Sequence, residues 1–268
     1  MLEDQGSLAH ILDYQTIMKF IKKVLYLILN ERLYFRIISS FFFILYFSGL
    51  LKASGKFKMH YLAARLVRKG DTIIDIGANL GYYTKIFALA TGSDGMVWAV
   101  EPVPLYREIL RKNTSRLSNI IILPFALGDR ESNEQMGIPG SQKFRHGLMR
   151  IEKNAEAGGQ GIRVEVKTPS LLFSNLERLD YIKCDIEGYE DRVIPGFMDM
   201  IRRDRPIIQI ELHPDNLAMI NELLLKAGYS AFVPLEKGLG KLNTGGDIKS
   251  DILYVHDDRY EQIKKFIK

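Results

Sequence analysis

The segment 75–81, with the sequence DIGANLG, constrains the fold more than any other part of the chain. It follows a short apolar stretch, 72–76, and leads into a helical pattern that begins at Tyr82. A strand that ends in glycines and opens a helix lets the backbone approach a nucleotide-like ligand closely. The segment therefore predicts an open α/β sheet with a ligand site beyond the carboxyl end of this strand.

The order of residues within this turn separates two classes of ligand. A dinucleotide site uses G-x-G-x-x-G, in which a helix N-terminus receives a pyrophosphate. Here the pattern is G-x-N-x-G, directly preceded by Asp75. A carboxylate repels a pyrophosphate but suits a ligand with an ammonium group, such as S-adenosylmethionine. Glu101 lies 20 residues after Gly81, at the end of the next predicted strand, where an acid can bind a ribose diol.

From about residue 60 onwards, apolar strand patterns alternate with helical patterns, which predicts a mostly parallel sheet with helices on both faces. The seven expected strands are 72–76, 96–100, 120–125, 181–186, 206–212, 229–233 and 252–255. The expected helices are 82–91, 104–117 and 215–227, with a β-hairpin element at 162–166. The fold class is thus α/β, with residues 1–60 as an N-terminal helical extension and residues 61–268 as the catalytic domain.

The extension carries most of the net charge of +5, because residues 1–60 alone contribute +4. Between residues 19 and 58 there are eight basic residues, one acidic residue and many aromatic rings. The longest uncharged run, 37–51, would span about 22 Å as a helix, less than the roughly 30 Å of bilayer hydrocarbon. Two interpretations stay open: helices that pack on the domain, or an element that lies on an anionic membrane surface.

The remaining composition bears on partners and location. The nearly neutral domain disfavours nucleic acid as a partner, and the single cysteine, Cys184, gives no sign of an oxidising compartment. We therefore expect a cytoplasmic protein, peripheral to the inner face of the cell membrane if the second interpretation of residues 19–58 holds. The oligomeric state has no signature in the sequence.

Five stretches in order resemble the FkbM-type family of S-adenosylmethionine-dependent methyltransferases, which are class I and Rossmann-like. They are 75–84 (DIGANLGYYT), 100–102 (VEP), 126–129 (ALGD), 182–190 (IKCDIEGYE) and 210–214 (IELHP). The resemblance covers roughly residues 70–256 and leaves residues 1–60 outside it. One departure is 168–172 (TPSLL), where the family more often has an acidic stretch before a short helix.

The resemblance implies S-adenosylmethionine as cofactor and assigns roles to particular positions. The cofactor-binding set is Asp75, Gly77, Asn79, Gly81, Tyr82, Glu101, Pro102, Ala126, Leu127 and Asp129, with the adenine near Ala126 and Leu127. The catalytic set is Asp185, Glu187, Glu211 and His213, delivered to one cleft by neighbouring strands. Asp185 or His213 is the expected base. These four side chains could together collect a divalent cation, but no ligand spacing compels it, and no metal is predicted.

The acceptor has no signature of its own in the sequence. The glycine-bearing loop 137–161, with Arg145, His146 and Arg150, is the expected cover on the acceptor side. By analogy with the family, the expected reaction is O-methylation of a sugar, glycan or small metabolite. Two alternatives remain: a nicotinamide-dependent oxidoreductase, and a non-catalytic, membrane-docked protein that binds the cofactor.

Overall fold

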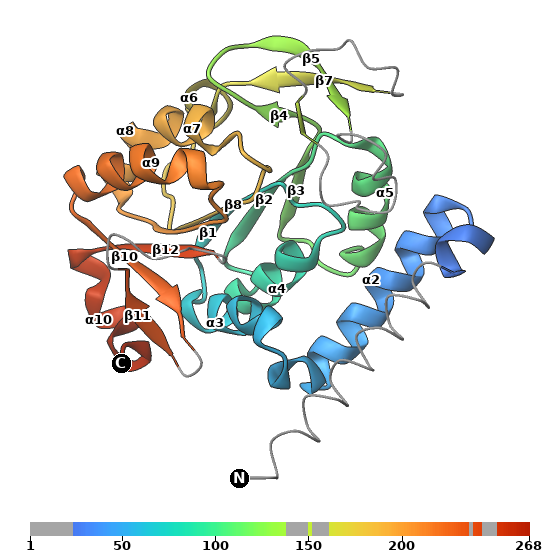
Figure 1. Cartoon of the computed structure of the whole chain (residues 1–268), viewed down its shortest axis with the longest axis horizontal. Helices are drawn as coiled ribbons and strands as arrows, with labels where there is room; N and C mark the ends of the chain where they lie inside the picture. The colour runs from blue at the N-terminus through green and yellow to red at the C-terminus, as the bar shows by residue number, and fades with distance from the viewer. Residues whose placement is uncertain (1–23, 138–149, 152–160, 236–237, 243–250) are drawn as a thin grey trace.

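The computed structural model describes residues 24–137, 150–151, 161–235, 238–242 and 251–268. A twisted eight-stranded sheet forms the centre of the molecule (Figure 1). In spatial order its strands are β11 (Leu239–Lys241), β10 (Tyr229–Pro234), β12 (Ile252–His256), β9 (Ile207–Ile210), β8 (Tyr181–Cys184), β1 (Thr72–Ile76), β2 (Met96–Val100) and β3 (Ile120–Leu123). The five strands from β9 to β3 are parallel, whereas β12 is antiparallel to both of its neighbours. The predicted α/β class with a mostly parallel sheet is confirmed.

The predicted count of seven strands is corrected to eight. The additional strand, β11, forms a hairpin at the edge of the sheet and pairs with β10 antiparallel, from Phe232 opposite Lys241 to Pro234 opposite Leu239. A strand of three residues is too short to display the alternation of apolar and polar residues from which strands are recognised. Its pairing therefore depends on the neighbouring strand rather than on a pattern of its own.

Helices cover both faces of the sheet. One face carries α3 (Lys58–Leu66), α4 (Tyr82–Thr91), α5 (Pro104–Asn113) and, near the C-terminus, α10 (Tyr260–Ile263). The opposite face carries α6 (Pro169–Leu172), α7 (Glu190–Val193), α8 (Met198–Asp204) and α9 (Pro214–Lys226). Short 3-10 turns complete the pattern: η1 (Leu50–Ala53), η2 (Gly55–Phe57), η3 (Ile194–Phe197), η4 (Asp257–Arg259) and η5 (Lys264–Phe266).

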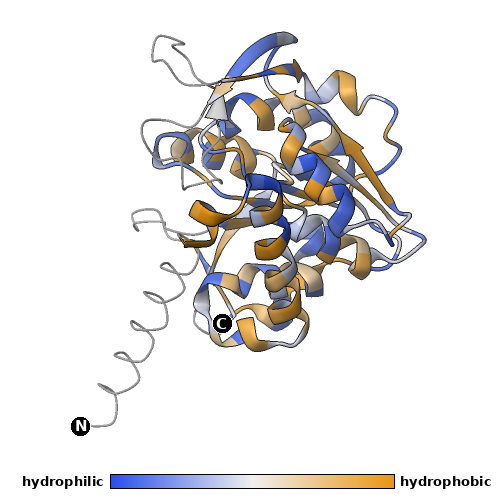
Figure 2. Ribbon diagram, turned by 90° about the vertical axis from the view of Figure 1, so that its right-hand side faces the viewer, coloured by the Kyte–Doolittle hydropathy of each residue, from blue (hydrophilic) through white to orange (hydrophobic). Residues whose placement is uncertain are grey.

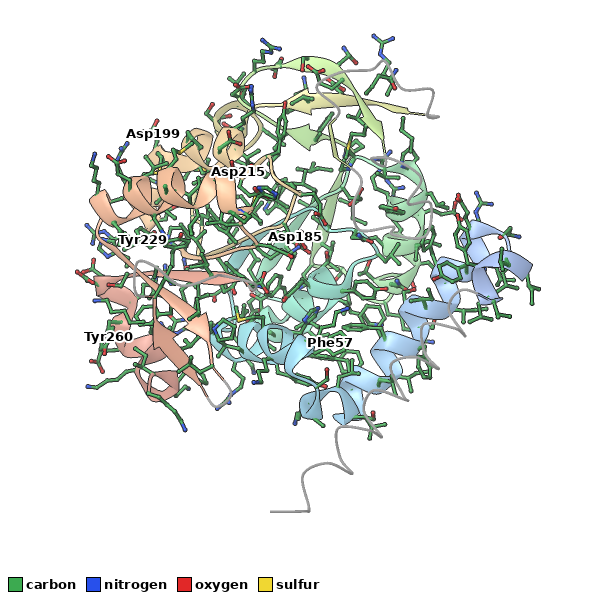
Figure 3. The ribbon with its side chains drawn as sticks, viewed as in Figure 1. Phe57, Asp185, Asp199, Asp215, Tyr229 and Tyr260 are labelled. Carbon is green, nitrogen blue, oxygen red and sulfur yellow. The ribbon has the colours of Figure 1, made fainter. Side chains whose placement is uncertain are left out.

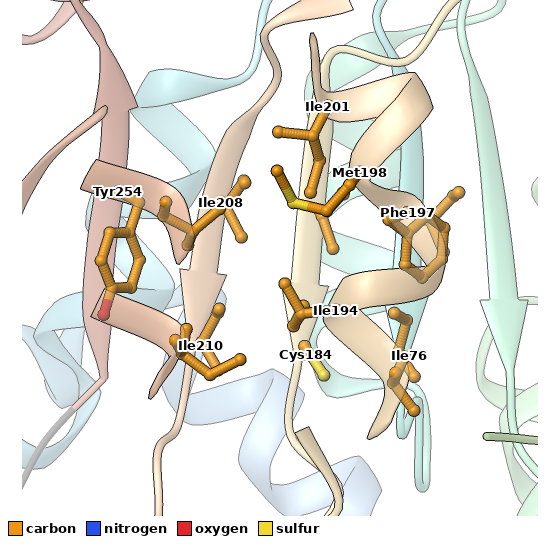
Figure 4. Packing of buried hydrophobic residues seen from close by; sticks show 14 of the residues in the cluster. Ile76, Cys184, Ile194, Phe197, Met198, Ile201, Ile208, Ile210 and Tyr254 are labelled. Atoms are coloured by element: carbon orange, nitrogen blue, oxygen red, sulfur yellow. The ribbon is translucent and has the colours of Figure 1, made fainter. Parts of the chain in front are cut away.

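The largest core cluster lies between the sheet and α7 to α9. Because successive side chains of a strand point to opposite faces, Ile182 and Cys184 face this cluster, together with Ile208 and Ile210 from β9. Figure 4 shows Ile208 and Ile210 beside Tyr254, and Cys184 beside Ile194, within this cluster. Cys184 is fully buried in this core. The polar residues that alternate with these positions therefore point to the opposite face of the sheet.

A second, smaller sheet lies above the carboxyl ends of the main strands (Figure 1). In spatial order it consists of β4 (Ala126–Leu127), β7 (Ile162–Lys167), β5 (Ser132–Gly137) and β6 (Arg150–Ile151). The β element predicted at 162–166 is β7, which pairs antiparallel with β5. Most of the loop expected to cover the acceptor lies outside the described residues.

The N-terminal extension contains α2 (Glu31–Phe47), which begins where the side chain of Asn30 accepts a hydrogen bond from the Leu33 N–H at 2.9 Å. Its inner face packs on α5 through Tyr34 and Phe35, both buried. The expected packing of this segment on the domain is thus present. The division of the chain at residue 60 stays a prediction, and α3 runs across that position. Within the described ranges, no helix is long and apolar enough to cross a bilayer.

Candidate active site

A cavity lies at the carboxyl ends of the parallel strands, at the edge of the sheet where the sequence predicts a ligand site. Nine of the predicted site residues line it: Gly77, Asn79, Glu101, Pro102, Ala126, Leu127, Asp185, Glu187 and Glu211. Asp185, labelled in Figure 3, lies near the middle of the molecule, directly after β8. These residues meet because parallel neighbours present their carboxyl ends at the same edge of the sheet.

The floor of the cavity is the turn after β1. Gly77 has a φ of 73°, in the left-handed region that glycine adopts freely. A Cβ at this position would lie 1.9 Å from the carbonyl oxygen of Asp185, so no larger residue fits. The N–H groups of Gly77 and Ala78 both donate to the carbonyl of Val100 at 3.0 Å. The turn is therefore held between β8 on one side and β2 on the other.

Glu101, at the end of β2, has its carboxylate fixed by two backbone donors. The N–H of Asn79 donates to Oε2 at 2.7 Å, and the N–H of Val103 donates to Oε1 at 2.8 Å. Glu101 is 4% exposed, and this burial raises its pKa to about 7, although both hydrogen bonds oppose the shift. The carboxylate thus faces the cavity in a geometry set by the turn after β1.

Two non-glycine residues of the cavity have a left-handed backbone conformation. Asn79 has a φ of 49° and Glu187 a φ of 55°. Such a conformation costs on the order of 1 kcal/mol for a residue with a Cβ. Hydrogen bonds hold both turns, since Asn79 donates to Glu101 and the N–H of Gly188 donates to the Glu190 carboxylate at 3.0 Å. Backbone strain is therefore concentrated at the cavity.

Asp75, predicted to face the cofactor, lies behind the turn and does not line the cavity. It is fully buried, and its Oδ2 accepts a hydrogen bond from the Thr84 hydroxyl at 2.6 Å. Its Oδ1 lies 3.8 Å from the ammonium nitrogen of Lys183, which is also 3.1 Å from the Asp185 carboxylate. Asp75 thus touches the site through Lys183.

Lys183 is a residue to which the sequence interpretation gave no role. It is 3% exposed, and burial by itself would lower its pKa, but the carboxylates of Asp185 and Asp75 raise the pKa above its ordinary value. The signal was present, because Lys183 and Asp185 are two residues apart in a strand and point to the same face. A buried lysine at this place indicates an ion pair built into the site.

Three carboxylates line the cavity, those of Asp185, Glu187 and Glu211, and a fourth, Asp251, is close enough to Glu211 to affect its pKa. Desolvation raises the pKa of Glu211 to about 7, and the negative charges of the other three add to the shift. Burial and Asp185 likewise raise the pKa of Asp251 to about 6. Asp251 directly precedes β12 and belongs to no motif, so only the pairing of β12 with β9 reveals it.

Two predicted site residues lie away from the cavity lining. The imidazole of His213 caps the N-terminus of α9 by accepting from the Asp215 N–H at 3.4 Å, and its side chain is 54% exposed. The carboxylate of Asp129 forms an ion pair with Arg192 at 3.0 Å. Their predicted roles, His213 as the base and Asp129 in cofactor binding, require a rearrangement of these contacts.

Gly81 and Tyr82, two further predicted site residues, do not line the cavity and instead pack the turn against neighbouring helices. Gly81 has a φ of 86°, and a Cβ there would lie 3.1 Å from Leu110 of α5. The ring of Tyr82 packs against Phe42 of α2, with ring centroids 4.5 Å apart. Both positions therefore fix how α4 leaves the turn.

The residues present fit S-adenosylmethionine. Apolar side chains form one part of the cavity, supplied by Val100, Pro102, Val103, Phe125, Ala126 and Leu127, as a flat adenine ring requires. Glu101 offers carboxylate oxygens to a ribose diol. The acidic end near Asp185 is suited to the positively charged ammonium and sulfonium groups of this cofactor. In the described part of the chain, no group of three or more His, Cys, Asp or Glu side chains could hold a metal ion.

The parallel sheet, the glycine turn after β1 and the acid that ends β2 define a Rossmann-like nucleotide-binding fold of the class I methyltransferase type. A family model described as "Methyltransferase FkbM domain" matches residues 75–231. The chain belongs to the FkbM methyltransferase family. This match decides against the nicotinamide-dependent oxidoreductase that the sequence left open.

Similar proteins include several methyltransferases. A protein of Sulfurisphaera tokodaii named "Probable cobalt-precorrin-6B C(15)-methyltransferase (decarboxylating)" is 29% identical over 126 residues, which are 44% of this chain and 65% of that protein. The ubiquinone/menaquinone biosynthesis C-methyltransferase UbiE of Cupriavidus taiwanensis is 25% identical, over 70% of this chain and 80% of that protein. The crystal structure of methyltransferase FkbM from Methylobacillus flagellatus KT is 18% identical with a TM-score of 0.47, over 71% of this chain and 44% of that chain.

Proposed function

We propose that the protein transfers a methyl group from S-adenosylmethionine to a hydroxyl oxygen of a sugar, glycan or small-metabolite acceptor. The observation that carries this proposal is the position of Glu211, whose carboxylate lines the cavity together with Asp185 and Glu187 and has a pKa raised to about 7. Such a group is well suited to accept a proton near neutral pH. Within the described chain Glu211 has no ion-pair partner, whereas Asp185 is engaged by Lys183.

When bound, S-adenosylmethionine supplies a methyl group on a positively charged sulfur, which an acceptor oxygen attacks in line as the sulfur keeps the electron pair of the broken bond. Glu211 takes the proton that the acceptor hydroxyl loses. Asp185 and Glu187 accept hydrogen bonds from neighbouring hydroxyls and so orient the acceptor. Lys183 keeps a positive charge beneath this group and limits the repulsion among its carboxylates.

The acidic edge also supports the proposed class of acceptor. Hydroxyl groups are hydrogen-bond donors, so a polyhydroxylated acceptor can donate to the carboxylates that line the cavity, Asp185, Glu187 and Glu211. The phosphates of a nucleic acid would instead be repelled by the same edge. We therefore favour a neutral, hydroxyl-rich acceptor and no nucleic acid.

The substitution Glu211→Gln tests the assignment of the base. The rate of methyl transfer by the unmodified chain is expected to rise with pH through about 7, because only the ionised Glu211 can accept a proton. In Glu211→Gln we expect kcat to fall by about 100-fold or more and the rise with pH to vanish. The measurement is transfer of labelled methyl onto cell-wall and lipopolysaccharide extracts across pH 5 to 9.

Two comparisons make the result decisive. His213→Ala addresses the alternative base, and loss of the pH-dependent rise in that variant, with Glu211→Gln unaffected, would assign the base to His213.

Titration calorimetry with S-adenosylmethionine tests the cofactor, and Glu101→Ala is expected to lose the binding that the unmodified chain shows. Absence of binding by the unmodified chain, or a product with the new methyl on carbon, would refute the proposal. Cofactor binding without turnover on any acceptor would favour the non-catalytic alternative.

A further inference from the structure

The outward face of α2 is apolar, which is unusual for the exposed side of a helix. Five side chains form a stripe along it, which we call the α2 stripe: Leu33, Ile37, Phe41, Ile44 and Phe47. Their exposed fractions run from 39% for Leu33 and Ile37 to 66% for Ile44. They recur every three or four residues, so they lie on one side of the helix. Figure 2 shows the side of the molecule on which α2 lies.

The exposure of the stripe does not arise from loose packing of the whole helix, because the opposite face of α2 is packed against the domain. Phe35 is 3% exposed and its ring lies edge-on to Tyr106 of α5, with centroids 5.4 Å apart. Phe43 is 5% exposed, and Lys85 of α4 lies 4.3 Å from the centre of its ring. The helix therefore has one face on the catalytic domain and presents a second apolar face outward.

Among the described residues, exposed large apolar side chains concentrate around this helix. Three more, Leu27, Ile28 and Leu50, lie within a few residues of its ends, with exposed fractions of 67% to 74%. Contiguous apolar surface of this kind marks an interaction site rather than an ordinary solvated face. Single exposed leucines elsewhere, such as Leu171 and Leu225, are isolated from such a group.

The charge around the stripe has one predominant sign. Residues 24–58 contain five basic residues and one acid, Glu31. Arg36, Lys52 and Lys56 are exposed. Basic residues near an apolar stripe are complementary to anionic lipid headgroups above acyl chains. A protein partner with an acidic rim would need a groove that matches the shape of α2, whereas a bilayer surface needs only an accessible apolar face.

The dimensions of α2 indicate how it would meet a bilayer. The helix has 17 residues, about 25 Å of length, while a hydrocarbon core is about 30 Å thick. Its inner face is also committed to α5. A helix with one face packed on protein and the other apolar can lie in the plane of the interface but not cross it.

We propose that the α2 stripe docks the protein on a membrane surface that contains anionic lipids. Phe35 on the inner face of α2 packs on Tyr106, and Tyr106 lines the cavity, so docking through the stripe holds the catalytic domain directly against the membrane. The proposal concerns where the enzyme acts and is independent of which atom it methylates.

Vesicle flotation of the full chain tests this docking. The probe is vesicles of phosphatidylglycerol and phosphatidylcholine, compared with vesicles of phosphatidylcholine alone. The variant Ile37→Glu/Ile44→Glu places two charges seven residues apart on the stripe. The matched control, Leu171→Glu/Leu225→Glu, makes the same change at exposed leucines of α6 and α9, 62% and 50% exposed. Calorimetry with S-adenosylmethionine on both variants reports that the domain is folded, separately from flotation.

We expect the unmodified chain to float with the anionic vesicles and the stripe variant to bind them at least about tenfold more weakly. The control variant should float like the unmodified chain, and raised salt should weaken binding because it screens the basic residues. No flotation of the unmodified chain, or equal flotation of the stripe variant, would overturn the proposal. A dimer seen by light scattering that Ile37→Glu/Ile44→Glu dissociates would instead identify the stripe as an interface between two copies.

Discussion

At the scale of single residues, the site depends on buried ionisable side chains, each of which has specific partners. Lys183 lies between Asp75 and Asp185, and removal of one partner from such a buried group leaves an uncompensated charge. Glu101 is also buried, and two backbone N–H groups hold its carboxylate. The two carboxylates raise the pKa of Lys183 and so favour its charged form, whereas burial raises the pKa of Glu101 to about 7 and makes its protonation sensitive to pH near neutrality.

The stability of the protein is therefore expected to fall as pH rises through the range in which Glu101 ionises. Its pKa is about 7 in the folded protein, against an ordinary value of 4.5. Between these values the folded protein binds a proton that the unfolded chain releases, so the free energy of unfolding decreases with pH and levels off above about 7. The contribution from Glu101 alone is roughly 1–3 kcal/mol.

Urea unfolding at pH 5 and pH 8 measures this contribution when Glu101→Gln is compared with the unmodified chain. The variant starts less stable, because an amide offers one acceptor to the two N–H groups of Asn79 and Val103. Its loss of stability between the two pH values should nevertheless be smaller. Equal losses in both proteins would show that Glu101 does not titrate in this range.

At the scale of secondary-structure elements, strand pairing decides which residues reach the cavity. The strands β1 and β8 are in register, so the turn at Gly77 meets the backbone of Asp185 directly. The sequence predicts both turns, because each combines glycine with an acid after an apolar strand. It does not predict that they touch, since parallel strands far apart in the chain acquire their order from the whole sheet.

Substitution of glycine by alanine at two positions separates backbone conformation from close approach. Gly77 and Gly70 both have left-handed φ values, 73° and 81°. A Cβ at Gly77 would lie 1.9 Å from the carbonyl oxygen of Asp185, whereas nothing lies within 4 Å of one at Gly70. Gly70→Ala should cost about 1 kcal/mol and Gly77→Ala at least about 3 kcal/mol more, as measured by urea unfolding.

The matched pair makes the outcome interpretable. Because both substitutions carry the same penalty for the left-handed conformation, their difference reports the contact between β1 and β8 alone. Similar costs for the two variants would show that the strand ends can separate freely.

At the scale of the whole molecule, α2 joins the extension to the catalytic domain. Phe35 and Phe41 lie on opposite faces of this helix, one 3% exposed and the other 44% exposed. Phe35→Ala should lower the free energy of unfolding by about 3–5 kcal/mol, because it opens a cavity against Tyr106. Phe41→Ala should change it by less than about 1 kcal/mol.

Thermal and urea unfolding of both variants provide the measurement. Phe35→Ala should also weaken the binding of S-adenosylmethionine, since Tyr106 lines the cavity. Equal stability of the two variants would mean that the packing of α2 on α5 does not stabilise the domain.

The sequence by itself determined seven strands of the central sheet, helices that alternate with them and the chemistry of the turns. Alternating apolar strands, the glycine pattern after Asp75 and the spacing to Glu101 are local, so they can be read without knowing which strands are neighbours. Tertiary structure alone decided the rest: that Asp75 reaches the site only through Lys183, that Asp251 joins Glu211, and that α2 has one face packed and one exposed. These relations are contacts between distant segments, and their energies depend on burial and mutual distance, which no local pattern encodes.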